Sequence, residues 1–205
     1  MASYSIAGKV VLVTGANRGI GKAIVEGFTK AGAGKIYAGV RRVETAPSGT
    51  VPLRIDLNGE DSIAQASEIA QDVQVIVNSG GILDVAPPLS ADAVLVMQKQ
   101  METNVYGMMH MARYFMPILE RNTNGCFVQI NSASSMRCKG DQFGGYAASK
   151  AASYMYTQSL RASTSTTRIL SVHPGPIATD MVNQYGAAEA EDASQVGTTS
   201  ATVGL

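Results

Sequence analysis

Hydrophobic residues follow two alternating patterns along the chain. Short apolar runs, rich in β-branched residues, recur with little polar alternation, which is typical of strands covered on both faces. Longer segments between them repeat apolar residues at helical spacing. We therefore expect strands at residues 10–13, 35–40, 51–55, 73–77, 126–131 and 169–173, and helices at residues 19–31, 60–71, 91–121 and 145–162.

This alternation of strands and helices predicts an α/β fold, a doubly wound parallel sheet with helices on both faces, in one domain over residues 1–205. Two segments depart from the pattern. Residues 41–50 contain Pro47 and Gly49 and are too short for a crossover helix. Residues 183–205 are rich in Ala, Ser, Thr and Gly, and we expect a loosely ordered tail there.

Composition narrows the class of protein. The chain carries 16 acidic and 16 basic residues, and 45% of its residues are hydrophobic, which excludes an intrinsically disordered protein. The neutral balance provides no field to attract nucleic acid or an anionic membrane, so we expect neither as a partner. The longest apolar run near the start, residues 10–13, is far too short to span a membrane.

The expected compartment is the cytoplasm. Residues 1–8 lack the basic and apolar regions of a signal peptide. Cys126 and Cys138 are the only cysteines. They lack the spacing of metal ligands and fit a reducing compartment better than a disulfide framework, so we expect no metal site.

A glycine-rich turn, Thr-Gly-Ala-Asn-Arg-Gly-Ile-Gly at residues 14–21, directly follows the first expected strand and opens a helix. Glycines in such a turn let the backbone approach a pyrophosphate, whose charge then lies at the helix N-terminus. The glycine spacing alone is weak, but its position between strand and helix is the context that the mechanism requires. The sequence predicts a dinucleotide site made by Gly15, Asn17, Arg18, Gly19, Ile20 and Gly21.

The end of the second expected strand indicates which dinucleotide binds. An NAD site carries an acidic residue there to hold the ribose 2′-hydroxyl. This chain instead has Arg41 and Arg42, with no acid before Glu44. A guanidinium at Arg41, assisted by Arg18, can bind a 2′-phosphate, which favours NADP(H) over NAD(H). A solvated surface role for either arginine leaves NAD(H) possible.

Tyr146 and Lys150 are four residues apart at the start of an expected helix, which places them on one face. A tyrosine with its ordinary pKa near 10 is a poor acid–base group at neutral pH. A neighbouring cation stabilises phenolate, so we expect Lys150 to lower the pKa of Tyr146. An exposed helical pair would have the same spacing.

The motifs together resemble the short-chain dehydrogenase/reductase family. They appear in one order: the glycine turn, Asn-Ser-Gly-Gly at residues 78–81, Asn104, serines after the fifth strand, Tyr-Ala-Ala-Ser-Lys at residues 146–150, and Pro-Gly-Pro-Ile-Ala-Thr at residues 174–179. The resemblance runs from about Gly8 to Met181. It implies a Rossmann sheet, a nicotinamide cofactor, reversible reduction of a carbonyl to an alcohol, and assembly as a homodimer or tetramer.

The resemblance also implies roles for individual residues. Tyr146 would exchange a proton with the substrate oxygen, Lys150 would assist it and bind the nicotinamide ribose, and Asn104 would support a water relay. The adenosine side of the cofactor would meet Asp56, Leu57, Asn78 and Gly80, and the nicotinamide side would meet Pro174, Gly175, Ile177 and Thr179. The family's Asn-Asn-Ala-Gly reads Asn-Ser-Gly-Gly here, which puts one stabilising hydrogen bond in doubt.

The catalytic serine has two candidates. Matching Asn131 to the family's Asn-x-x-Ser selects Ser134, twelve residues before Tyr146. The usual separation of thirteen falls on Ala133, and Ser132 is the rival at fourteen. We prefer Ser134, and each choice implies a length change in the following loop.

Two apolar stripes follow the expected helix at 91–121. Four methionines surround Asn104 on one face, which we expect to pack on the sheet: Met97, Met101, Met108 and Met111. A second stripe suggests a subunit interface shared with the helix at 145–162: Val105, Met109, Ala112 and Met116. We expect His173 to be structural.

Three functions remain open. The first is NADP(H)-dependent interconversion of a carbonyl compound and its alcohol. The others are an NAD-linked alcohol dehydrogenase and a dinucleotide-binding regulatory protein with little turnover. The last is motivated by length, because members of the family usually continue for some tens of residues beyond the Pro-Gly motif, and we expect an abbreviated C-terminal edge.

Overall fold

The computed structural model describes residues 4–175, 177–178 and 191–192. Six strands form one parallel sheet in the order β3-β2-β1-β4-β5-β6, which confirms the predicted doubly wound sheet. The strands are β1 (Val10–Thr14), β2 (Lys35–Val40), β3 (Val51–Arg54), β4 (Val75–Asn78), β5 (Cys126–Ile130) and β6 (Arg168–Val172).

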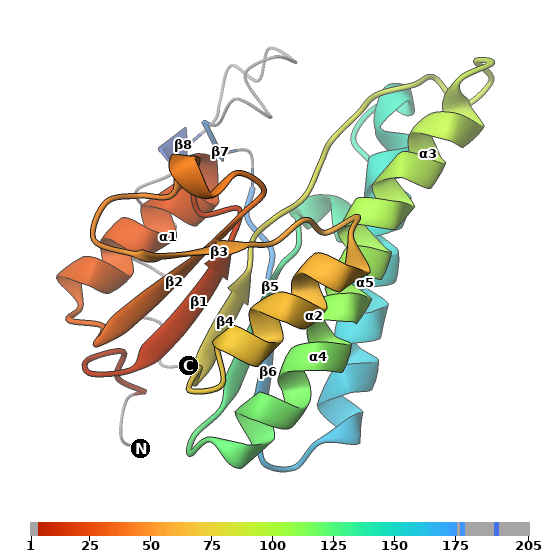
Figure 1. The fold of residues 1–205 in the computed structure, drawn as a ribbon. Coiled ribbons are helices and arrows are strands. Elements are labelled where there is room, and N and C mark those ends of the chain that lie inside the picture. Colours follow the sequence, from red (N-terminus) through yellow and green to blue (C-terminus); the bar gives the residue numbers. More distant parts are fainter. Residues whose placement is uncertain (1–3, 176, 179–190, 193–205) are drawn as a thin grey trace.

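Helices cover both faces of the sheet (Figure 1). On one face lies α1 (Gly19–Lys30), and on the other lie α2 (Glu60–Ile69), α4 (Gly107–Arg121) and α5 (Gly144–Ser163). The helix α3 (Ala93–Met101) extends beyond the carboxyl ends of the strands. Short 3₁₀ turns are η1 (Val43–Thr45), η3 (Ala133–Ser135) and η4 (Asp141–Phe143).

The strand register divides the core into two layers. Leu12, Ile76 and Phe127 are aligned across β1, β4 and β5, and all three are fully buried under α2 and α4. Their neighbours Val75 and Cys126 point to the opposite face, toward α1. Strands buried on both faces cannot show polar alternation, which is why these runs read as continuously apolar.

Element boundaries differ slightly from the predicted ones. The fourth strand begins at Val75, and the sixth covers Arg168–Val172. As predicted, residues 41–50 form no crossover helix; the connection contains only η1.

The predicted helix at 91–121 is interrupted. A π-helical segment, η2 (Glu102–Tyr106), separates α3 from α4. Its wider turn rotates α3 relative to α4, so the predicted methionine stripe does not stay on one face. Met108 and Met111 are fully buried against the sheet, whereas Met97 is 40% exposed.

The second stripe is mostly buried. Val105, Ala112 and Met116 are buried within the chain itself. Met109, the fourth member of the stripe, is half-buried. The subunit interface predicted along this helix and the helix at 145–162 stays a prediction.

Of the predicted tail, the structure describes only β8 (Glu191–Asp192), which pairs in parallel with β7 (Ile177–Ala178). Among the described residues no helix is both long and apolar enough for a membrane span.

Candidate active site

The glycine turn closes tightly on itself and on the residues that follow β4. Gly15 has a φ of 65°, and a Cβ there would lie 3.1 Å from Gly80 Cα. A Cβ at Gly21 would lie 2.2 Å from the carbonyl oxygen of Gly15. Only glycine fits this approach, and the N-terminus of α1 follows directly with no acidic residue in its first turn. The turn is therefore shaped to accept a pyrophosphate.

Thr14 joins this turn to β4. Its hydroxyl donates to Asn78 Oδ1 at 2.7 Å and accepts from the backbone N–H groups of Ser79 and Gly80 at 3.1 and 3.0 Å. Asn78 in turn donates from Nδ2 to Gln129 Oε1 at 2.8 Å. Asn78 is only 1% exposed, and its Oδ1 and Nδ2 atoms are both hydrogen-bonded within the protein. It therefore supports the site as part of the buried layer beneath it.

The predicted adenosine side has mixed burial. Leu57 is buried in the core, and a Cβ at Gly80 would lie 2.8 Å from Leu57 Cδ1. The Leu57 side chain thus supports Gly80. Asp56 is half-buried after β3, and its carboxylate accepts from the Asn58 N–H at 3.1 Å.

Cationic side chains remain available around the turn. Asn17 Nδ2 donates to Thr45 Oγ1 at 3.2 Å, which joins the glycine turn to η1. Arg42 forms an ion pair with Glu44 at 3.8 Å. Arg18 and Arg41 are exposed and pair with no acidic group in the part of the chain that the structure describes. Both can therefore bind an anion.

Tyr146 and Lys150 lie on one face of α5, as their spacing predicted, and both are buried, which excludes the alternative of an exposed pair. The Lys150 Nζ atom lies 5.8 Å from the centre of the Tyr146 ring and donates to the carbonyl oxygen of Ile130 at 3.1 Å. Complete burial lowers the pKa of Lys150 to about 8.

Burial also affects the phenol of Tyr146. Burial raises its pKa, and a hydrogen bond with the side chain of Ser132 acts in the opposite direction. The pKa of Tyr146 therefore lies above its ordinary value, because desolvation of the phenol outweighs its stabilisation. A lowering of this pKa by Lys150 stays a prediction.

Ser132 is the serine that the structure brings to Tyr146. It precedes η3, and its hydroxyl accepts from the Ser134 N–H at 3.1 Å. Ser134 thus takes part through its backbone. The hydrogen bond between Ser132 and Tyr146 favours Ser132 as the catalytic serine, whereas motif matching selects Ser134.

Asn104 lies in the π-helical segment and is 2% exposed. Its Oδ1 atom accepts from the Ile82 N–H at 2.9 Å, and its Nδ2 donates to the Ile82 carbonyl and to Ser149 Oγ, both at 3.0 Å. A Cβ at Gly81 would lie 3.0 Å from Asn104 Oδ1 and 3.6 Å from Lys150 Nζ. Gly81 therefore keeps space between the two polar groups.

The segment after β6 closes the other side of the site. The Pro174 carbonyl accepts from the Ala133 N–H at 3.0 Å, so it lies against η3, and Gly175 is exposed. Ile177 begins β7, and Thr179 lies outside the described residues.

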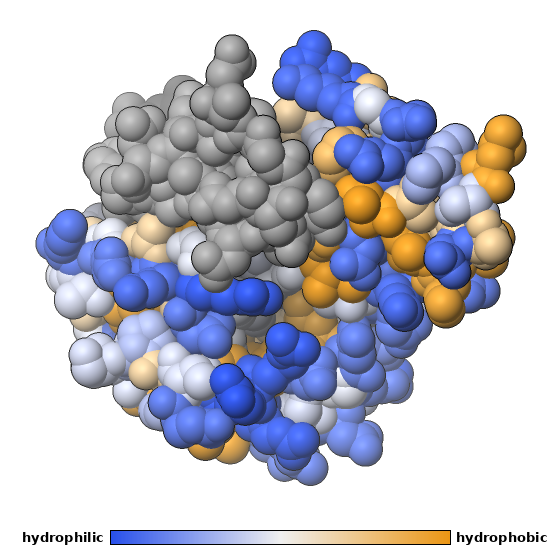
Figure 2. Space-filling model, turned by 90° about the horizontal axis from the view of Figure 1, so that it is seen from above, coloured by the Kyte–Doolittle hydropathy of each residue, from blue (hydrophilic) through white to orange (hydrophobic). Residues whose placement is uncertain are grey.

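The carboxyl edge of the sheet carries an apolar rim. Figure 2 views this edge from above and shows orange apolar surface on the side where α3 lies. Leu89 is 98% exposed and Val94 69% exposed, and Met136 after η3 is also exposed. No group of three or more His, Cys, Asp or Glu side chains suited to a metal forms among the described residues.

Comparisons with known proteins agree with this geometry. Residues 9–190 match the family model described as short chain dehydrogenase. The chain is 32% identical over 213 residues to the 3-oxoacyl-[acyl-carrier-protein] reductase MabA of Mycobacterium tuberculosis, covering 95% of this chain and 82% of that protein. It is 29% identical over 195 residues to the NADP-dependent 3-hydroxy acid dehydrogenase of Schizosaccharomyces pombe, covering 84% and 73%.

A solved structure shows the same fold. The short chain dehydrogenase from Burkholderia cenocepacia in complex with NADP superposes with a TM-score of 0.90 at 30% identity, over 96% of this chain and 85% of that chain.

Proposed function

Because the chain belongs to the short-chain dehydrogenase family, we propose that it is an NADP(H)-dependent oxidoreductase that interconverts a carbonyl compound and its alcohol. The observation that carries the proposal is the position of Tyr146. It is buried together with Lys150 and Asn104 and faces Ser132. It lies in the first turn of α5, which begins at the same end of the sheet as the glycine turn (Figure 1).

Residues of this chain transfer the proton that the carbonyl oxygen needs during reduction. Tyr146 donates its phenolic proton to the carbonyl oxygen during reduction and takes it back during oxidation. Ser132 binds the same oxygen and stabilises phenolate by a hydrogen bond. Lys150 supplies positive charge beside the ring. NADPH, when bound, supplies the hydride.

The cofactor preference rests on Arg41 and Arg18. The turn has no room for a Cβ at Gly15 or Gly21, and this close backbone packing suits a pyrophosphate bound at the turn. The two exposed guanidinium groups suit a 2′-phosphate. The similar structures contain different cofactors. One at 30% identity contains NADP, and another at 20% identity contains NADH. NADP(H) is the proposed cofactor, and NAD(H) is the alternative.

The enzymatic proposal is tested with NADPH and a panel of aldehydes, ketones and quinones. We expect the wild type to oxidise NADPH and Tyr146→Phe to lose about 10²- to 10⁴-fold in kcat/KM. Tyr106→Phe, an exposed tyrosine on η2, is the control and should keep the wild-type rate. Equal low rates in all three proteins, with NADPH still bound, would instead support a dinucleotide-binding protein with little turnover.

The cofactor proposal has its own experiment. We expect Arg41→Asp to reduce the preference for NADPH over NADH by at least about tenfold, since a carboxylate repels the 2′-phosphate and accepts from a ribose hydroxyl. Arg121→Asp, at the far end of α4, is the control. An unchanged ratio of kcat/KM values in Arg41→Asp would contradict the role of Arg41.

A further inference from the structure

A second polar cluster lies behind the catalytic serine. The cluster consists of His173, Ser171, Asn131, Ser135 and the carbonyl of Ser132, at the carboxyl ends of β5 and β6. None of these contacts was expected from the sequence, which predicted only that His173 is structural.

One contact favours a particular tautomer of His173. Its Nδ1 atom lies 3.1 Å from the Ser132 carbonyl oxygen. Because a carbonyl oxygen only accepts hydrogen bonds, this contact is a hydrogen bond only when Nδ1 carries the proton, and we assign the proton to Nδ1 on that ground. The same N–H also faces Ser135 Oγ at 2.8 Å, and Ser135 Oγ donates its own proton to the Ser132 carbonyl at 2.7 Å.

The opposite nitrogen then accepts. Ser171 Oγ lies 2.8 Å from His173 Nε2 and receives a hydrogen bond from Asn131 Nδ2 at 2.7 Å. Its hydroxyl proton is therefore free to point at Nε2. The chain of donors runs in one direction, from Asn131 through Ser171 and His173 to the Ser132 carbonyl.

The ring is also fixed by packing. Tyr154 on α5 meets His173 edge-on, with ring centres 4.8 Å apart. The imidazole thus contacts β6, η3 and α5 as well as the carbonyl of Ser132, the residue that faces Tyr146.

We propose that His173 is a positioning residue of the reaction, whose Nδ1-protonated imidazole holds the Ser132 carbonyl and so fixes the orientation of the Ser132 hydroxyl toward Tyr146. This role rests on the proposed function, because it concerns the same site. In this role His173 acts through Ser132 and not on the reacting atoms.

Two matched variants test the role. His173→Phe keeps a ring against Tyr154 and removes both hydrogen bonds, whereas His173→Asn keeps a donor near the position of Nδ1. We expect His173→Phe to lose about 10- to 100-fold in kcat/KM with unchanged NADPH binding, and His173→Asn to recover most of it. The pH profile of alcohol oxidation should also move to higher pH in His173→Phe, since Ser132 no longer stabilises phenolate.

Controls separate positioning from loss of folding. Ser135→Ala should reproduce part of the effect, and the double variant Ser135→Ala/His173→Phe should be no worse than His173→Phe alone, because both act on one carbonyl. Melting temperatures report folding. Equal losses in His173→Phe and His173→Asn, or a lower rate with an unmoved pH profile, would overturn the role.

The tautomer can be read without any turnover. The chain has two histidines, so the ¹⁵N imidazole spectrum of the wild type is assigned by comparison with His173→Phe. We expect a protonated Nδ1 and an unprotonated Nε2 at His173. A proton on Nε2 alone would refute the proposal about His173 even if no carbonyl is reduced. Absence of turnover in a protein with the expected tautomer would count against the enzymatic proposal only.

Discussion

At the scale of single residues, the site places a lysine where its charge is costly. Lys150 is completely desolvated, which lowers its pKa to about 8, and its described hydrogen-bond acceptor is the Ile130 carbonyl. That carbonyl also accepts from Gln129 Nε2 at 3.1 Å. Burial therefore disfavours the charged form of Lys150. If the lysine is replaced, the Ile130 carbonyl still accepts a hydrogen bond from Gln129.

We expect Lys150→Met to remove activity and yet stabilise the free protein. A pKa depressed from 10.5 to about 8 corresponds to a penalty of about 3 kcal/mol at pH 7. Loss of one hydrogen bond offsets part of it, so unfolding free energy should rise by about 1–2 kcal/mol. Urea unfolding measures the difference.

The sign of the pH dependence is fixed by linkage. The unfolded lysine binds its proton up to pH 10.5, whereas the folded one loses it near pH 8. The wild type is therefore penalised fully below pH 8, and the penalty disappears as the pH rises to 10.5. The advantage of Lys150→Met should shrink between pH 7 and pH 9.5. Lys99→Met, an exposed lysine on α3, is the control, and a constant advantage would contradict the assignment.

At the scale of elements, the fold was largely predictable and the details of the site were not. Continuous apolar runs and helical periodicity identify β1, β4, β5 and α1 because burial on both faces leaves few alternatives. The interruption at η2 had no periodic signal in the sequence, and neither did the hydrogen bonds of Asn104, within η2, with the Ile82 backbone. The hydrogen bond between Ser132 and Tyr146 likewise had no signal in the spacing of the serines.

A lone polar residue in an apolar strand is a sequence signal for a buried hydrogen-bond network. Gln129 is the only polar residue between Cys126 and Ile130, and it is 1% exposed. A buried amide needs partners, and its partners are Asn78 and the Ile130 carbonyl. Such a residue at the end of a central strand predicts a polar connection to its neighbours.

The start of α1 provides a prediction for this element. A Cβ at Gly21 would overlap the Gly15 carbonyl, whereas a Cβ at Gly144 meets nothing within 4 Å. We expect Gly21→Ala to weaken NADPH binding at least about tenfold and to lower the melting temperature, and Gly144→Ala to change neither. NADPH fluorescence measures binding. Normal affinity in Gly21→Ala would show that the turn relaxes without loss.

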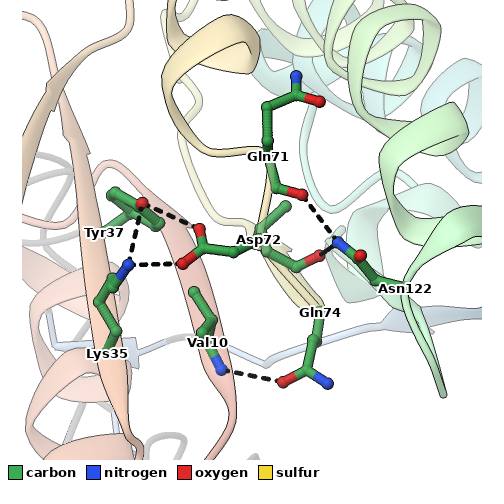
Figure 3. Close-up of polar contacts among 8 residues, drawn as sticks. Val10, Lys35, Tyr37, Gln71, Asp72, Gln74 and Asn122 are labelled. Carbon is green, nitrogen blue, oxygen red and sulfur yellow. Dashed lines mark hydrogen bonds and ion pairs between the residues drawn. The ribbon is translucent and has the colours of Figure 1, made fainter.

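At the scale of the whole molecule, a polar cluster at the amino ends of the strands joins segments that are distant in sequence (Figure 3). Tyr37 donates to Asp72 Oδ1 at 2.9 Å, and Lys35 forms an ion pair with the same carboxylate. Asn122 at the end of α4 donates to the Gln71 and Val73 carbonyls at 3.0 and 2.8 Å. This cluster lies at the opposite end of the sheet from the start of α5, which carries Tyr146.

We expect Asp72→Asn to lower stability at neutral pH without changing kcat or KM. Burial alone would raise the pKa of Asp72, but hydrogen bonds from Lys35 and Tyr37 hold it below its ordinary value of 3.8. Its contribution is therefore present above that value and is lost as the pH falls through the lower folded pKa. Thermal melts at pH 7 and pH 3.5 measure the difference.

The control for that prediction is Glu68→Gln, an exposed carboxylate on α2. It should melt with the wild type at both pH values. A deficit in Asp72→Asn that is as large at pH 3.5 as at pH 7 would show that packing, and not the charge of Asp72, is responsible.

The order of strands also has a consequence for synthesis of the chain. β1 is made first, yet one of its neighbours, β4, pairs with it across 64 residues, and α5 follows much later. β1 therefore stays without this neighbour until residue 78 has been translated, which delays formation of the central part of the sheet during synthesis.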